Sequence, residues 1–563
     1  MNSASSRRAL RRHCLFILFT SVLLPAVWAH AGDVPPAEVA PASQHDYDAG
    51  TSQMFEPTDS AVSPVSALDR AVLQPPEPPP GLPSEPAPYS PQAIEGQSAP
   101  PAATPAPAAA AKKPAAPPAP YKGVFYDNDF SYLTKPDNKY CYFGDCLKRN
   151  ECGDCWIYDL GGEYRARHHH EVNLRGSNLS GLSDDFLLHR TRLFANVEYS
   201  NWFRFYGEAI DAVSEFEDFT PRTIEENRFD ALNLFVDGLI SDYGEGEWWG
   251  RVGRQELLYG DQRLISPLDW SNTRRTFDGA KAFYRSKVWD FDGFWTRPVP
   301  FSQHINSDSN FDHPDQSQEF MGLYTTYKGR KDHVYDFYFL RLAEYDGPDT
   351  TFFPRDFDAN TLGTRWKGKH CCWLWEVEGG YQFGDFGTRD QSAGFFTGGL
   401  GREWAQARWK PTLWAYYDWA SGDRDPTDGR HGTFNQLFPL GHKYFGFADL
   451  VARQNINDVN FIWTASPTQK LKLLAWYHIF FLDESRDALY NSAGAPIRVD
   501  PTGAAGRDVG QELDLTVQYI FSPRSDILVG YSHFWAGDFV QATNPAGVTG
   551  DVDFVYTQFT TRF

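Results

Sequence analysis

The sequence predicts an all-β protein: a transmembrane antiparallel β-barrel of roughly 18 strands, preceded by a disordered Pro/Ala-rich segment. Three observations predict this fold. Apolar and polar residues alternate along many segments, and the connections between these segments are alternately long and short. The chain also ends on a strand-like segment closed by Phe563. Together these features are typical of a bacterial outer-membrane barrel.

The alternation has a period of two, as expected when successive side chains point to opposite faces of a sheet. Trp373, Trp375 and Val377 alternate with Glu376 and Glu378. Residues 156–166, 187–199 and 513–519 show the same pattern. Many of the apolar positions are Trp or Tyr, which suits the aromatic girdles of a membrane barrel better than the interior of a soluble sandwich.

The connections supply independent support for the barrel. We expect long connections at 168–185, 211–228, 258–277, 297–318, 343–359, 385–401, 421–455, 482–509 and 536–552. Tight links lie between them, for example at 200–201, 410–411, 466–469 and 522–525. Long loops on one side of the membrane and short turns on the periplasmic side are the outer-membrane pattern.

Composition and charge limit the function. Aromatic residues make up 16% of the chain, yet mean hydropathy is only −0.50 because polar residues alternate with them. The net charge is −21, so the chain as a whole does not have the basic character of a nucleic-acid-binding protein. Any basic surface must be local.

Four parts follow one another along the chain. Residues 1–31 form a signal peptide, with Arg7, Arg8, Arg11 and Arg12 before an apolar run and a small-x-small cleavage site. Residues 32–120 are a Pro/Ala-rich periplasmic linker that we expect to be disordered. Residues 121–155 form a cysteine-containing periplasmic segment, and 156–563 form the barrel.

The stretch 250–285 carries an unusual density of cations between two strand-like pieces. It predicts a basic loop over or inside the mouth of the barrel; the alternative is a surface loop in contact with lipopolysaccharide. Arg251 and Arg254 are three residues apart, so their side chains point to opposite faces of a regular strand. Both can face the lumen only if a β-bulge lies between them. Candidate pore-lining, anion-binding residues are Arg165, Arg190, Arg192, Arg204, Arg251, Arg254, Arg263, Arg274, Arg275, Lys281, Arg285 and Arg365.

Converging arginines attract anions, and their planar guanidinium groups suit carboxylates. Acids on the same faces, such as Glu198, Glu376 and Asp514, leave two alternatives open. The cations are either a basic conduit or ordinary lumen residues paired with acids of the wall. Most candidate cations fall on the first six strands, whereas two later strands are acidic. An electric field across the pore, from a basic side to an acidic side, is therefore as compatible with the sequence as a uniformly basic channel.

Catalytic and metal-binding motifs have little support. His168, His169 and His170 are consecutive, so they alternate in direction on a strand and suit a shared metal poorly. Asp423, Asp425 and later residues lack the spacing and the closing glutamate of a calcium loop. We find no nucleophile elbow and no zinc-protease helix motif. We therefore predict no enzymatic activity, no catalytic residue, no metal and no cofactor.

Six cysteines remain after removal of the signal peptide: Cys141, Cys146, Cys152, Cys155, Cys371 and Cys372. An even number in an oxidising compartment predicts disulfides that compact residues 121–155 into a lid over the periplasmic mouth, with one bond to Cys371 or Cys372 as a further option. The rival interpretation is a metal site, since Cys152 and Cys155 have ligand spacing.

Several motifs resemble the alginate-export family of outer-membrane barrels: GRQEL at 253–257, DWSNTRRTFDG at 269–279, ASGD at 420–423 and TFNQLFP at 433–439. The resemblance covers roughly residues 156–563. It implies an eighteen-strand conduit, lined by Arg and Lys, for passive passage of an anionic polysaccharide or oligosaccharide such as a uronate polymer.

The alternatives are a general or small-solute uptake porin and, with less support, an outer-membrane hydrolase. We expect the protein in the outer membrane of a Gram-negative-type bacterium, with its N-terminal segment in the periplasm. Expected partners are outer-membrane lipid and lipopolysaccharide, the anionic cargo and periplasmic secretion proteins.

Overall fold

A computed structural model describes residues 119–175, 179–301, 311–347, 354 and 356–563. The predicted signal peptide and almost all of the predicted linker lie outside the described residues.

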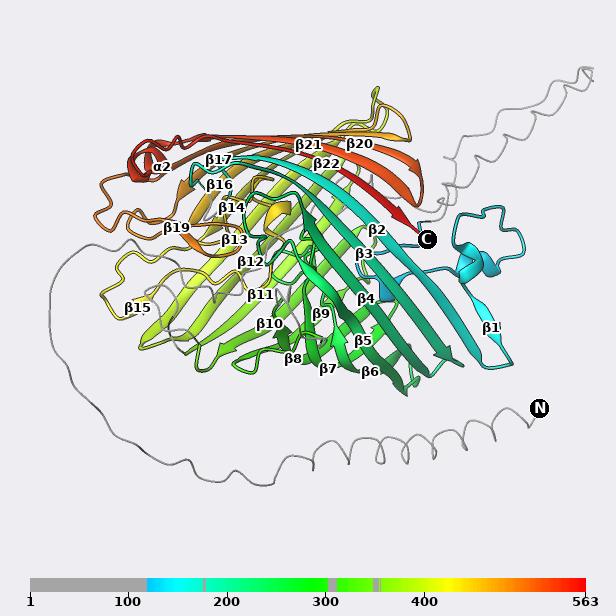
Figure 1. Cartoon of the computed structure of the whole chain (residues 1–563). Helices are drawn as coiled ribbons and strands as arrows, with labels where there is room; N and C mark the ends of the chain where they lie inside the picture. The colour runs from blue at the N-terminus through cyan, green and yellow to red at the C-terminus, as the bar shows by residue number, and fades with distance from the viewer. Residues whose placement is uncertain (1–118, 176–178, 302–310, 348–353, 355) are drawn as a thin grey trace, which may run out of the picture. The chain divides into compact units, whose positions relative to one another are not determined.

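Within the described residues, eighteen antiparallel strands close into a barrel, because the last strand, β22 (Val552–Arg562), pairs with the first, β2 (Trp156–Val172). Figure 1 shows this closure, with red β22 beside cyan β2. The strands between them follow in chain order: β3 (Asp184–Tyr199), β4 (Phe203–Glu215), β5 (Asn227–Ser241), β6 (Gly246–Gln255), β7 (Thr276–Ser286), β8 (Trp289–Val299), β9 (Gln318–Tyr327), β10 (His333–Glu344), β11 (Phe357–His370), β12 (Trp373–Phe386), β13 (Arg389–Glu403), β14 (Thr412–Ala420), β16 (Ile456–Ala465), β17 (Leu471–Leu482), β20 (Asp508–Ser522) and β21 (Ser525–Ala536).

Smaller elements lie outside the barrel wall's regular pairing. β1 (Asn150–Cys152) pairs with the start of β2, and β15 (Arg430–His431) runs parallel to β13. β18 (Leu489–Tyr490) and β19 (Pro496–Arg498) form a small hairpin. The helical pieces are η2 (Phe125–Asp127), η3 (Ser131–Thr134), η4 (Asp145–Leu147), η5 (Gly441–Lys443) and α2 (Asp538–Thr543). In the described ranges, no helix has the length and apolarity needed to cross a bilayer.

The two faces of the wall have opposite character. On β12, Trp373, Val377 and Tyr381 are 37–54% exposed, whereas Glu376 and Glu378 are at most 4% exposed. Apolar side chains therefore face outward and charged ones inward, the reverse of a soluble barrel. This confirms the predicted transmembrane β-barrel.

Short turns gather at one end of the barrel and long connections at the other. The short-turn end includes 200–202, 287–288, 371–372 and 523–524, and the long-loop end includes 256–275, 421–455 and 483–507. The predicted long connection at 385–401 is wrong. β12 continues to Phe386 and β13 begins at Arg389, so a two-residue turn joins them, with Gly387 in the left-handed region (φ 62°).

Candidate functional site

The lumen side of β2 and β3 carries a row of arginines. Arg165 and Arg167 on β2, with Arg190 and Arg192 on β3, are 1–3% exposed, and we call these four residues the basic wall. Arg165 and Arg190 are direct cross-strand partners. Glu163, two residues before Arg165 on β2 and opposite Arg192, pairs with Arg190 at 2.7 Å. Buried guanidinium groups need such partners, because an unpaired buried charge is very costly.

Residues 256–275, between β6 and β7, fold into the lumen against this wall; we call them the inward loop. Arg165 donates hydrogen bonds to the carbonyl oxygens of Asp269 (2.7 Å), Trp270 (3.1 Å) and Ser271 (2.8 Å). Arg190 donates to those of Asp269 (2.9 Å) and Ser271 (3.0 Å). The Arg167 guanidinium lies 3.7 Å from the centroid of the Trp270 ring. The predicted inward folding of this connection is confirmed.

The side chain of Asp269 adds a carboxylate to this contact. It accepts a hydrogen bond from Arg190 at 2.7 Å and forms an ion pair with Arg274. Burial raises the pKa of Asp269, but Arg274, Arg190, Arg165 and Arg192 outweigh it and hold the pKa well below its usual range. Asp269 is therefore a fixed negative charge inside the lumen.

A second inward segment, residues 432–454, meets the inward loop from the other side. Ile265 and Phe438 form a parallel bridge, and the Ser266 amide donates to the Phe438 carbonyl at 2.9 Å. The Trp270 ring stacks on His442, with 3.9 Å between ring centroids. These contacts belong to one large apolar core inside the barrel.

A nearby part of the wall holds this second segment through acids on β20, which only β22 and β21 separate from β2. Glu512 on β20 accepts a hydrogen bond from the amide of Ala448 at 2.8 Å, and Asp514 accepts one from Phe447 at 3.2 Å. Both acids are fully buried. The basic wall therefore binds backbone oxygens and the acidic side binds backbone N–H groups. Since β20 lies only three strands from β2, the electric field across the pore that the sequence left open stays a prediction.

Residues 119–149 pack against the short-turn end of the lumen, and we call them the N-terminal lid. The Tyr126 hydroxyl donates to the Glu256 carbonyl at 2.7 Å, which connects the lid to the inward loop. Arg192 lies 3.8 Å from the centroid of the Phe125 ring. The Tyr121 hydroxyl donates to the carbonyl of the last residue, Phe563, at 2.7 Å.

The cysteines do not hold this lid. All six described cysteines are free thiols, so the predicted disulfides are not formed in the structure. In the β1–β2 hairpin Cys152 lies opposite Trp156, not opposite another cysteine. Aromatic packing and the ion pair between Asp145 and Arg524 compact the lid instead. Among the described residues, no group of three or more His, Cys, Asp or Glu side chains could hold a metal.

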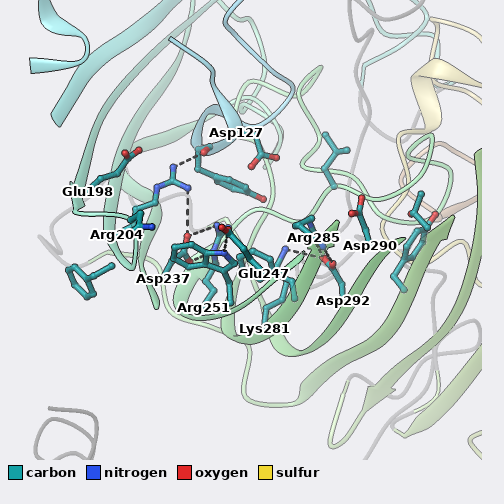
Figure 2. A pocket seen from close by; sticks show the side chains of 18 of the residues that line it. Asp127, Glu198, Arg204, Asp237, Glu247, Arg251, Lys281, Arg285, Asp290 and Asp292 are labelled. Carbon is teal, nitrogen blue, oxygen red and sulfur yellow. Dashed lines mark hydrogen bonds and ion pairs between the residues drawn. The ribbon is translucent and has the colours of Figure 1, made fainter. Parts of the chain in front are cut away.

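A cavity of about 720 Å³ lies beside the lid and reaches the short turns. Arg204 and Arg251 converge on Asp237, and Lys281 and Arg285 converge on Asp292 (Figure 2). Its cations are Arg149, Arg204, Arg251, Lys281 and Arg285, and its carboxylates are Asp127, Glu198, Asp237, Glu247, Asp290 and Asp292. Charge is therefore almost balanced in this cavity, which we call the balanced cavity.

A second cavity, of about 340 Å³, lies beside the walls of β11 to β17 and has a different charge. Its cations are Arg263, Lys367, Lys410, Lys443 and Lys472, against the carboxylates Asp261, Glu376 and Asp418. Asp261 pairs with Lys367 and Lys443. Within the described part of the chain, neither Lys410 nor Lys472 has an ion-pair partner. We call this site the lysine-rich cavity.

Eleven of the twelve predicted cations lie on the lumen face or in the inward loop: Arg165, Arg190, Arg192, Arg204, Arg251, Arg263, Arg274, Arg275, Lys281, Arg285 and Arg365. Most contact protein carbonyls or carboxylates instead of open space; Arg365, for example, pairs with Asp336 and Glu376.

Arg254 is the exception. It pairs across the sheet with Leu234 and Asp278 on the outer face, because β6 has no bulge between it and Arg251. Its place among the lumen cations is therefore a wrong prediction.

A family profile described as alginate export matches residues 157–550, which is most of the chain. The chain belongs to the alginate-export family. As a member of this family it is an outer-membrane barrel of the channel type, and no curated protein matches it.

Solved structures with a similar fold include Pseudomonas aeruginosa OccD3 (OpdP) and Acinetobacter baumannii OccAB1. Their TM-scores are 0.48 and 0.47, each at 12% identity. Each comparison covers 72% of this alginate-export chain, and 91% and 96% of the other chain, respectively.

Sequence reasoning missed several functional candidates in this alginate-export barrel. Lys410 and Lys472 stand at or near short turns, where basic residues are usually read as ordinary surface charge. Lys443 and Arg453 lie in the second inward segment, within the region that the sequence predicts only as a long connection, 421–455. The motif TFNQLFP at 433–439 was the available signal, since its apolar residues exceed what an exposed loop carries.

Proposed function

We propose that this alginate-export barrel passes an anionic polysaccharide or oligosaccharide across the outer membrane, and that cargo carboxylates bind first in the lysine-rich cavity. The observation that carries the proposal is the excess charge of this cavity: five cations face three carboxylates, and Lys410 and Lys472 have no ion-pair partner among the described residues. Uncompensated cations in a recess concentrate anions.

The aromatic lining supports a sugar ligand. Trp414, Tyr416, Tyr444 and Trp476 line the same cavity. Aromatic rings offer flat, partly apolar faces that suit the C–H faces of sugar rings, and their polar atoms can bond hydroxyl groups. A uronate residue combines these two requirements with a carboxylate for the lysines.

The balanced cavity favours a second candidate function, the general or small-solute uptake porin. Its five cations face six carboxylates, so it does not select for anions by net charge. Uncharged solutes suit it better than uronate polymers. The two candidates thus differ in which cavity governs passage.

Current block in planar bilayers tests the proposal. Uronate oligomers and neutral oligosaccharides of equal length are added on the short-turn side of the mature protein. We expect uronate block, and about tenfold weaker block when Lys410→Gln and Lys472→Gln are combined. The matched control combines Lys328→Gln and Lys331→Gln, in the β9–β10 turn outside this cavity.

The control variant should keep the wild-type block. Equal block by neutral and anionic oligosaccharides, or no effect of the lysine changes, would support the small-solute candidate over the proposal.

A further inference from the structure

The outer face of the barrel carries a row of charges at the long-loop end of β5 to β10. Each of these six consecutive strands contributes one residue. We define the outer charge belt by these six residues: Arg228, Arg254, Asp278, Arg297, Glu319 and Arg341. Figure 1 shows these strands side by side in chain order.

The belt faces the lipid and not the lumen. Arg297 shares a strand face with Trp295, which is 43% exposed, and Arg341 shares one with Phe339, which is 37% exposed. Arg254 lies directly opposite Asp278, which lies directly opposite Arg297. These three charges therefore form a continuous row across the outside of the wall.

Three belt arginines, Arg228, Arg297 and Arg341, are paired but partly exposed, whereas Arg254 is only 9% exposed and bonds Asp230, Asp278 and the Asp312 carbonyl. Arg228 bonds Asp211 at 2.9 Å, Arg297 pairs with Glu319 at 3.2 Å, and their side chains remain 52% and 24% exposed. Arg341 pairs with Asp358 and is 26% exposed. A guanidinium has five N–H donors, and within the described residues Arg228 uses only one of them.

The other side of the barrel differs at the same level. On β12 to β20, the outward polar contacts include neutral pairs, Tyr381 with Ser392 and Tyr417 with Asn457, and hydrogen bonds from Trp419 and Asn457 to the carboxylate of Asp483. The arginines are thus concentrated on one sector, which a general need for polar residues at the membrane boundary does not explain.

The position of the belt relative to the bilayer follows from its charge. An arginine facing lipid costs about 2–4 kcal/mol at the bilayer midplane but only about 0–1 kcal/mol near the interface. Six outward charges in one row therefore belong at the level of the headgroups. The long-loop end of an outer-membrane barrel faces outside the cell, so these are headgroups of the outer leaflet.

We propose that the outer charge belt is a docking surface for lipopolysaccharide, with the arginines binding the phosphates of its lipid A headgroup. Guanidinium forks bind phosphate through paired hydrogen bonds, and their spacing on successive strands presents several donors to one glycolipid.

Lipid binding to the full mature protein in detergent tests this proposal. The probes are bis-phosphorylated lipid A, dephosphorylated lipid A and phosphatidylglycerol, each measured by native mass spectrometry. The test variant combines Arg228→Gln, Arg297→Gln and Arg341→Gln. A matched control combines Lys328→Gln, Lys331→Gln and Arg402→Gln at the short-turn end.

We expect the dissociation constant for bis-phosphorylated lipid A to rise about tenfold in the test variant and to stay unchanged in the control. A triple Arg→Lys variant should recover part of the binding, and gel mobility before and after heating shows that each barrel is folded. Wild-type binding by the Gln variant would overturn the proposal. So would equal affinity of the wild type for dephosphorylated lipid A or phosphatidylglycerol.

Discussion

Replacing Asp269 by Asn should loosen the inward loop and make the channel more anion-selective. The Asp269 carboxylate accepts a 2.7 Å hydrogen bond from Arg190 and pairs with Arg274. Its pKa lies well below the usual range despite burial, so the wild-type residue stays charged across the working pH range. Asn keeps the size and one acceptor oxygen but removes the charge.

The magnitude follows from these two contacts. A hydrogen bond to a charged group contributes about 1.5–3 kcal/mol, and Asn retains part of each contact. The Asp269 side chain is 27% exposed, which places the total near the low end, at about 2–4 kcal/mol. Since about 1.4 kcal/mol is a factor of ten, the detached loop should become roughly 30- to 700-fold more populated.

Single-channel recording in planar bilayers measures both effects. We expect more frequent visits to a higher conductance, and a reversal potential under a salt gradient that shifts towards anions. Asp269→Glu, which keeps the charge, and Asp278→Asn, which removes a charge from the outer face, serve as controls. A folded Asp269→Asn channel with wild-type conductance and wild-type reversal potential would refute the reasoning.

Three further predictions concern other parts of the chain. Deleting residues 119–148 should raise conductance, because the N-terminal lid covers part of the short-turn end; an unchanged conductance would show that ions bypass it. All six thiols should react with maleimide in unreduced protein, and disulfide-linked peptides in mass spectrometry would contradict this. Burial and Glu225 raise the pKa of Glu217 to about 8, so its stability contribution is fully present below about pH 4.5 and disappears as the pH rises through 8. Thermal unfolding at pH 5 and pH 8 should therefore differ less for Glu217→Gln than for the wild type.

The barrel could be predicted because the pattern that indicates it lies within each strand's own sequence. A membrane-spanning strand must alternate apolar and polar residues, and this period can be counted in the sequence. The β12–β13 hairpin was missed because its glycines resemble loop signals. In the structure they make room for rings: a side chain at Gly399 would overlap the Tyr416 ring, with 2.0 Å from its Cβ to the nearest ring atom. Such packing joins residues on different strands, so it cannot be recognised from the sequence of one segment.

The candidate site was predicted only in part, for a related reason. The alternation of inward and outward side chains along β2 and β3 is enough to place Arg165 and Arg190 on the lumen face. Their partners are backbone carbonyls of Asp269 and Ser271, about eighty to a hundred residues later in the chain. Every residue has a carbonyl, so no pattern of side chains identifies which ones the inward loop brings to the arginines.

The same contacts bear on the proposed selection of an anionic cargo. At the basic wall, Arg190 already binds a carboxylate, that of Asp269, together with backbone carbonyls. A cargo carboxylate can replace Asp269 while the buried guanidinium keeps an anionic partner. A neutral sugar that displaced the loop would leave that guanidinium with one charge partner, Glu163, in place of two. If cargo passes along this wall, this difference favours uronate over neutral oligosaccharides, and Asp269→Asn should strengthen uronate binding because no competing carboxylate then has to be displaced.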